Sequence, residues 1–206
     1  MARFNGRMAA TSSPREPRAD ATRNRQALIR AATAAVHREG PRVPMATIAA
    51  EAGVGIGTLY RHFSTREELL AYLTHGSFEK VLANAQTAER TGATATAALQ
   101  LFVEAAISQR NDLVLPLHGG PRPRAPATRA LQQQVHQIIQ QIIDRGRGDG
   151  TIRQDVTPRE IIALGAMLAQ PRQADPDWDA TCRRLLTTYL TGLSCGAKRQ
   201  GVSAQS

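Results

Sequence analysis

Long apolar runs and cysteines are both scarce in this chain of 206 residues. No stretch of about 18 apolar residues occurs, so we expect no membrane-spanning helix. The two cysteines, Cys182 and Cys195, stand thirteen positions apart, and on one straight helix they would lie about 20 Å from each other. Because that is beyond disulfide reach, we expect reduced thiols in a cytoplasmic protein, with a redox sensor as the alternative.

Lysine is scarce as well. Lys80 and Lys198 are the only lysines among 26 basic residues, and the formal net charge is +9. The guanidinium fork of arginine suits phosphates and guanine edges, so this balance is compatible with a nucleic-acid partner. Membranes and acidic proteins also attract basic surfaces, so charge alone does not decide the partner.

The patterns by which many enzymes are recognised are missing too. The five histidines show no His-x-x-x-His spacing, and there is no paired-cysteine motif. No phosphate-binding glycine loop follows a strand, and no nucleophile elbow occurs. We therefore expect no catalytic residue, no metal and no cofactor, and an enzyme is the least favoured of the functions considered.

What the sequence does contain is helical periodicity, and no segment alternates apolar and polar residues as a strand would. A capping box of Ser64 and Glu67 is expected to start a long fourth helix. A second capping box, Thr157 to Glu160, opens a later helix, and Asp175-Pro176 opens the last one. The expected helices begin near Asn24, Pro44, Ile56, Arg66, Ala93, Leu131, Pro158 and Asp175. The predicted fold class is all-α, with three short helices before the long one.

Both ends of the chain are expected to be disordered. Residues 1–22 hold four arginines among small and polar residues and have too little apolar surface to fold. A disordered basic tail is the favoured interpretation, and an arm in the DNA minor groove is the alternative. Residues 198–206 form a second expected tail.

The segment from Ile48 to Phe63 carries the strongest functional signal. It comprises a helix, a turn that needs glycine, and a second helix with polar residues on its exposed side. This is the pattern of a helix-turn-helix, whose second helix enters the major groove with its N-terminal end first. Leu59 and Phe63 are expected to be core residues of that unit.

The chain resembles the tetracycline-repressor (TetR) family from about Arg25 to about Leu73, centred on Ala52-Gly-Val-x-x-Gly-Thr-Leu-Tyr-x-His-Phe63. The last helix, ending Tyr189-Leu-x-Gly-Leu193, is also similar. The resemblance implies a helix-turn-helix DNA-binding domain at 23–68 and a helical ligand-binding and dimerisation domain at 69–197. It also implies a ligand-released repressor that binds a palindromic operator as a homodimer. A regulator without a small-molecule ligand is the alternative.

The resemblance further implies which residues contact DNA. Some match positions that face bases, others match phosphate contacts, and Tyr60 matches both. Alanine stands at position 46, where relatives often carry arginine, so Thr47 is a candidate substitute for that contact. Tyr60 and His62 could instead be ordinary surface residues. The predicted DNA-binding set is Thr47, Gly55, Ile56, Gly57, Thr58, Tyr60, Arg61, His62 and Arg66.

Two further sites are predicted in the C-terminal domain. A pocket for a small apolar or amphipathic effector would use residues of the middle helices, although such a stripe is more often plain core. The last two helices carry apolar residues on more than one face, which favours a homodimer. The predicted pocket set is Phe78, Leu82, Phe102, Leu113, His118, Val135 and Ile139, and the predicted dimer set is Ile162, Leu168, Trp178, Leu186, Tyr189 and Leu193.

Overall fold

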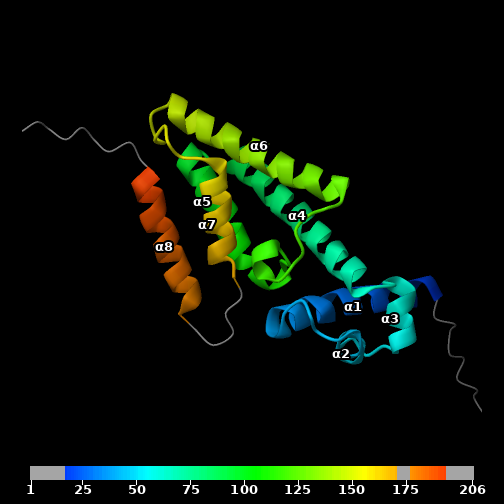
Figure 1. Ribbon diagram of the computed structural model, residues 1–206. Coiled ribbons are helices and arrows are strands. Elements are labelled where there is room, and N and C mark those ends of the chain that lie inside the picture. The colour runs from blue at the N-terminus through cyan, green and yellow to red at the C-terminus, as the bar shows by residue number, and fades with distance from the viewer. Residues whose placement is uncertain (1–16, 171–176, 194–206) are drawn as a thin grey trace, which may run out of the picture.

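The computed structural model describes residues 17–170 and 177–193, and every regular element within those ranges is a helix (Figure 1). The N-terminal half contains α1 (Pro17–Glu39), α2 (Met45–Glu51), α3 (Ile56–His62) and α4 (Arg66–Thr91). The C-terminal half contains α5 (Ala95–Ser108), the 3-10 turns η1 (Arg110–Asp112) and η2 (Pro116–His118), α6 (Pro126–Gly148), α7 (Pro158–Leu168) and α8 (Trp178–Leu193). The predicted all-α class is confirmed.

Helix α1 begins earlier than the sequence pattern predicts. It starts at Pro17 and has 23 residues, so the predictions of a tail through residue 22 and of a short first helix are both wrong. Proline suits the first turn of a helix because its φ is already helical and its missing N–H has no partner there. The other expected tail residues lie outside the described ranges, as do Cys195 and the expected helix start at Asp175-Pro176.

Two hydrophobic clusters form the interior. One joins α1, α2 and α3 through residues such as Leu28, Ile48 and Leu59, and we call this part the head. The other joins α5 to α8 through residues such as Leu99 and Ile139, and we call it the body. The two clusters lie at opposite ends of the molecule, with α4 running from one to the other (Figure 1).

The long helix α4 belongs to both clusters. Leu69 and Leu73 near its start are buried in the head, whereas Val81 and Leu82 are buried in the body. Its first turn shows that the predicted capping box is displaced by one residue. Thr65 is the N-cap, and its side chain accepts a hydrogen bond of 3.0 Å from the backbone N–H of Glu68. The pattern Ser/Thr-x-x-Glu fits either register here, because serine and threonine are adjacent and two glutamates follow.

In the body, α7 begins as the sequence predicts. Thr157 and Glu160 form a full capping box, with Pro158 at the first helical position. Helix α6 buries a stripe that includes Val135 and Ile142.

Candidate nucleic-acid interface and ligand pocket

The turn between α2 and α3 depends on Gly53. Its φ is +67°, a left-handed conformation that side chains with a Cβ rarely adopt. The Gly53 N–H donates to Ala50 O and the Val54 N–H donates to Ala49 O, both at 3.0 Å. These two bonds form a Schellman motif, which satisfies the last carbonyls of α2 and sends the chain sharply into α3.

Helix α3 is anchored from inside and exposed outside. Leu59 and Phe63 are buried, as the motif predicts. On the other side, Tyr60 is 50% exposed and Ile56 is 43% exposed. An apolar and an aromatic side chain therefore project from α3 into solvent beside polar neighbours.

All the predicted DNA-binding residues lie on the outside of the head, and none belongs to its core. Among them, Gly55, Ile56, Gly57, Tyr60 and Arg61 are exposed, whereas Thr47, Thr58, His62 and Arg66 are half-buried. Together they include the start and outer face of α3, the first turn of α2 and the first residue of α4.

Two details of this surface could not be read from the sequence. The Arg61 guanidinium is folded back on its own helix, and its Nε donates to Gly57 O at 3.3 Å. Arg25 lies over the rings of Phe63 and Tyr72, with its Cζ 5.5 and 4.7 Å from the ring centroids. Arg25 thus fastens α1 to the end of α3 and the start of α4 by cation–π contact.

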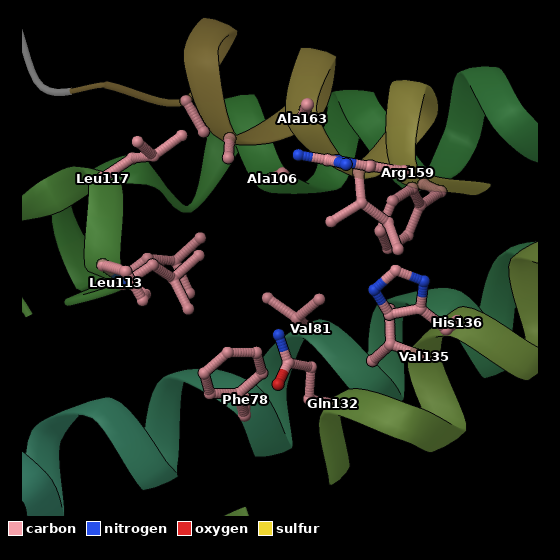
Figure 2. Close-up of a pocket in the computed structure, with 17 residues that line it drawn as sticks. Phe78, Val81, Ala106, Leu113, Leu117, Gln132, Val135, His136, Arg159 and Ala163 are labelled. Atoms are coloured by element: carbon pink, nitrogen blue, oxygen red, sulfur yellow. The ribbon is translucent and has the colours of Figure 1, made fainter. Parts of the chain in front are cut away.

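An open cavity of about 230 Å³ lies inside the body, between α4, α5, α6 and α7 (Figure 2). Its walls are almost entirely apolar. The lining residues are Phe78, Val81, Phe102, Ala106, Leu113, Leu115, Pro116, Leu117, Gln132, Val135, His136, Arg159, Ile162, Ala163, Gly165, Ala166 and Ala169.

The cavity contains part of the predicted pocket set. Phe78, Phe102, Leu113 and Val135 line it, whereas Leu82, His118 and Ile139 do not. Leu82 and Ile139 are packed in the body core, because they lie on the same helical stripes as the lining residues but one turn further along.

His118 has a structural role instead of a place in the pocket wall. It is buried, its Nε2 donates to Ala166 O at 2.8 Å, and its Nδ1 lies 3.3 Å from Leu113 O. The described polar residues that do line the cavity are Gln132, His136 and Arg159, and none of them belongs to the predicted pocket set. Gln132 and His136 stand four residues apart on α6, so helical spacing places them side by side.

A short segment after η1 joins the head to this cavity. Leu113 lines the cavity, and the next residue, Val114, is buried in the head core. Leu113 O accepts a hydrogen bond of 2.9 Å from Nε2 of His37 on α1. The Val114 N–H donates to Ser77 Oγ on α4 at 2.8 Å. The chain here is therefore held by α1 and α4 at once, a connection that no sequence motif indicates.

Burial corrects much of the predicted dimer set. Leu168, Leu186 and Leu193 are at most 5% exposed in a single chain, so their side chains form the protomer's own core. Ile162 lines the cavity.

The remaining two predicted residues, Trp178 and Tyr189, are half-buried. The large apolar side chains that are exposed on α7 and α8 are Met167, at 52%, and Leu185, at 48%. Periodicity identified the apolar stripe of α8 correctly but could not tell whether that stripe faces its own core or a partner.

The thiol of Cys182 is buried, and its Sγ donates to Leu168 O at 3.3 Å. Burial raises the pKa of the Cys182 thiol, which disfavours the reactive thiolate and argues against the redox-sensor alternative. Within the described ranges, no helix is long and apolar enough to cross a membrane. No group of three or more potential ligands suited to a metal ion is found in the same part of the chain.

Two family descriptions match the sequence. Residues 28–73 match "Bacterial regulatory proteins, tetR family", and residues 92–195 match "Transcriptional regulator SbtR-like, C-terminal domain". The two matches divide the chain as the head and the body do.

Solved structures share the fold over most of their length. The ketosteroid transcriptional regulator KstR2 of Mycobacterium tuberculosis is 20% identical with a TM-score of 0.65, covering 82% of this chain and 94% of that one. The TetR regulator SCO0520 from Streptomyces coelicolor is 26% identical with a TM-score of 0.54, covering 84% and 99%. FadR from Bacillus subtilis, solved in complex with stearoyl-CoA, is 20% identical with a TM-score of 0.58, covering 84% and 100%.

Proposed function

This chain belongs to the tetR family of bacterial regulatory proteins, and we propose that it is a repressor that binds a palindromic operator as a homodimer and leaves it when a small ligand binds. As a member of that family it is a DNA-binding regulator of transcription with an N-terminal helix-turn-helix. The observation that carries the proposal is the path of α4, which is buried in the head core at Leu69 and lines the body cavity at Phe78 and Val81. One rigid element thus connects a DNA-reading surface with a cavity.

In the proposed complex, α3 lies in the major groove. Gly55, Ile56 and Gly57 face the groove floor, because they are exposed at the N-terminal end of α3. Thr58 and His62 hold phosphates and so position the head without reading sequence. Arg61 reaches a base edge or a phosphate after leaving Gly57 O, to which it is bonded in the free protein.

The proposed homodimer uses the outer faces of α7 and α8. The exposed side chains of Met167 and Leu185 support this choice, because each puts a large apolar side chain on the outer surface of one of these two helices, where a partner would bury it. A two-fold dimer would present two copies of α3 to two half-sites about 34 Å apart, and a palindromic operator follows from that symmetry.

Release is proposed to occur by a shift between two arrangements of the head relative to the body. A ligand in the cavity would press on Phe78 of α4 and on Leu113 together. Leu113 O is bonded to His37 of α1, and His118 connects the same carbonyl region to Ala166 of α7. Displacement of either wall would therefore tilt the head and move the two α3 helices out of register with the groove.

The test begins with selection of binding sites from random DNA by the full chain. We expect a palindrome bound by one dimer, with light scattering of the complex giving two chains per site. In vitro transcription from a promoter that contains the selected site should then fall when the protein is added. Selection of an asymmetric site bound by one chain, or increased transcription, would contradict the proposed homodimeric repressor.

A further inference from the structure

We propose that the cavity binds a compact anionic amphiphile, an apolar body that ends in one carboxylate, with Arg159 as the partner of the carboxylate. The inference rests on the proposed ligand-responsive function and specifies the chemical class of the ligand. It is carried by three observations: the sign of the charge at the cavity, the free hydrogen-bonding groups there, and the size of the space.

The charge that the described residues bring to the cavity wall has one sign. Among those residues, Arg159, exposed on the first turn of α7, is the one lining residue that is always charged, and no aspartate or glutamate lines the cavity. His136 on α6 is the other described titratable group in the lining. Figure 2 shows His136 and Arg159 towards one end of the cavity, with Leu113 and Leu117 at the other. An amphiphile would place its anionic end at the first and its apolar body against the second.

The polar groups of the lining are free to take a ligand. Within the part of the chain that the structure describes, neither Arg159 nor Gln132 nor His136 has a hydrogen bond or ion pair. Two other arginines of the body are paired, Arg110 with Asp179 at 2.9 Å and Arg147 with Asp144 at 2.9 Å, whereas Arg145, outside the cavity, is unpaired like Arg159 within the described ranges. A guanidinium fork without a carboxylate, beside an apolar cavity, is suited to a carboxylate that arrives with the ligand.

The size of the cavity limits the apolar body. A cavity of 150 Å³ in another protein holds benzene, so about 230 Å³ suits roughly nine or ten non-hydrogen atoms. This favours a medium-chain or simple aromatic acid. The stearoyl chain that accompanies FadR of Bacillus subtilis is much longer than such a ligand.

The experiment is calorimetric titration of the full chain with octanoate and 3-phenylpropanoate, each compared with its neutral amide. Because Arg159 is exposed, we expect the carboxylates to bind about 2- to 5-fold more tightly than the amides. Arg159→Gln should abolish that preference, and Arg159→Lys should restore part of it, because a charge remains without the fork. The matched control is Arg145→Gln, which changes an exposed arginine of α6 outside the cavity and should leave the preference unchanged.

A second variant separates this inference from the function on which it rests. Ala106→Phe fills the cavity and should abolish binding of acid and amide alike, with folding checked by circular dichroism and Ala166→Leu used if that variant unfolds. If acid and amide bind equally and both are lost in Ala106→Phe, the ligand pocket stands and the anionic class is wrong. If neither acid binds, or if Arg159→Gln retains the preference, the inference is wrong, whereas repression in vitro still tests the proposed function.

Discussion

Inward-facing residues serve different purposes in the head and in the body. In the head, residues such as Leu59 and Phe63 hold the unit together, and the residues proposed to contact DNA all lie outside. In the body, inward-facing residues of α4 to α7 line the cavity, so residues such as Phe78 and Phe102 serve both packing and the proposed binding. A substitution inside the head should therefore affect stability, whereas one inside the body can affect stability, ligand binding or both.

The two regions also differ in how they contact α4. The head holds the start of α4 in a closed core, with Leu69 only 1% exposed. The body holds the middle of α4 against a partly empty space, where Phe78 and Val81 have the cavity as a neighbour. A helix that is buried in the head core at its start and borders the cavity at its middle is suited to carry a displacement of its middle to the head.

The largest expected effect distinguishes the inner and outer faces of α8. Leu186→Asp buries a carboxylate where leucine is 1% exposed, so it should cost more than the 2–5 kcal/mol that is about typical of Leu→Ala in a core. Leu185→Asp changes a side chain that is 48% exposed, so the chain should stay folded but dissociate into monomers. Circular dichroism in urea measures the first effect, and light scattering measures the second.

Thr187→Asp, at an exposed position of the same helix, is the control and should change neither quantity. A Leu185→Asp protein that remains a dimer at low micromolar concentration would show that the interface lies elsewhere. Any loss of stability in that variant has to be compared at equal protein concentration, since dimerisation itself stabilises the fold.

The sequence predicted the head better than the body, for a physical reason. In the head, short elements and a turn fix the neighbours of each residue. The motif therefore determines that Gly53 lies in the turn, that Leu59 is in the core and that Tyr60 is on the surface. In the body, a long amphipathic helix shows which residues share a stripe but not which helix the stripe faces. Leu186 illustrates this limit, because its place in the apolar stripe of α8 fits a partner's surface as well as the protomer's own core.

The cavity could be predicted only in part. Phe78 and Phe102 of the predicted pocket set line the cavity, but an incompletely filled space depends on how five segments meet and has no periodicity of its own. Arg159 was missed because, between Thr157 and Glu160 of the capping box, it reads as an ordinary exposed residue of a first helical turn. The bond between His37 and Leu113 O joins residues 76 positions apart, a distance over which no local pattern extends.

A smaller effect separates positioning from reading within α3. Arg61→Ala should lower operator affinity by about 1–3 kcal/mol and relax the preference at one base pair if Arg61 makes a bidentate base contact. Thr58→Ala should weaken binding to all DNA sequences by a similar amount, since phosphates carry no sequence information. Repeating the selection from random DNA with each variant measures both outcomes. An unchanged consensus for Arg61→Ala would make Arg61 a backbone contact.

Substitutions at two glycines distinguish a residue needed for the fold from one proposed to lie close to DNA. Gly53→Ala places a Cβ at a φ of +67° and should destabilise the chain by about 1–2 kcal/mol. Gly57 has nothing within 4 Å of a Cβ built on it, so Gly57→Ala should stabilise the isolated protein by about 0.5–1 kcal/mol. If α3 approaches DNA as proposed, Gly57→Ala should nevertheless weaken operator binding. A Gly57→Ala variant that is more stable and binds DNA normally would remove Gly57 from the interface.

The smallest expected effect concerns the link between the two regions and depends on pH. Burial lowers the pKa of His37 below its ordinary 6.5, and the nearby His118 acts in the same direction, while the bond to Leu113 O and the charge of Asp112 oppose them. Because the folded pKa is lower than the unfolded one, the folded state disfavours the protonated form. The stabilisation from neutral His37 is therefore fully present above pH 6.5 and is lost as pH falls towards the folded pKa.

The variant His37→Gln keeps a donor for Leu113 O but does not titrate. The melting temperature of the native chain should therefore fall relative to that of the variant between pH 7.5 and pH 5.5, by about a few degrees at most. Calorimetry at a series of pH values measures the difference between the two proteins, in which the other titrating groups cancel. A difference that is constant with pH would mean that His37 does not change its protonation on folding, and the link between head and body would then not respond to pH through this residue.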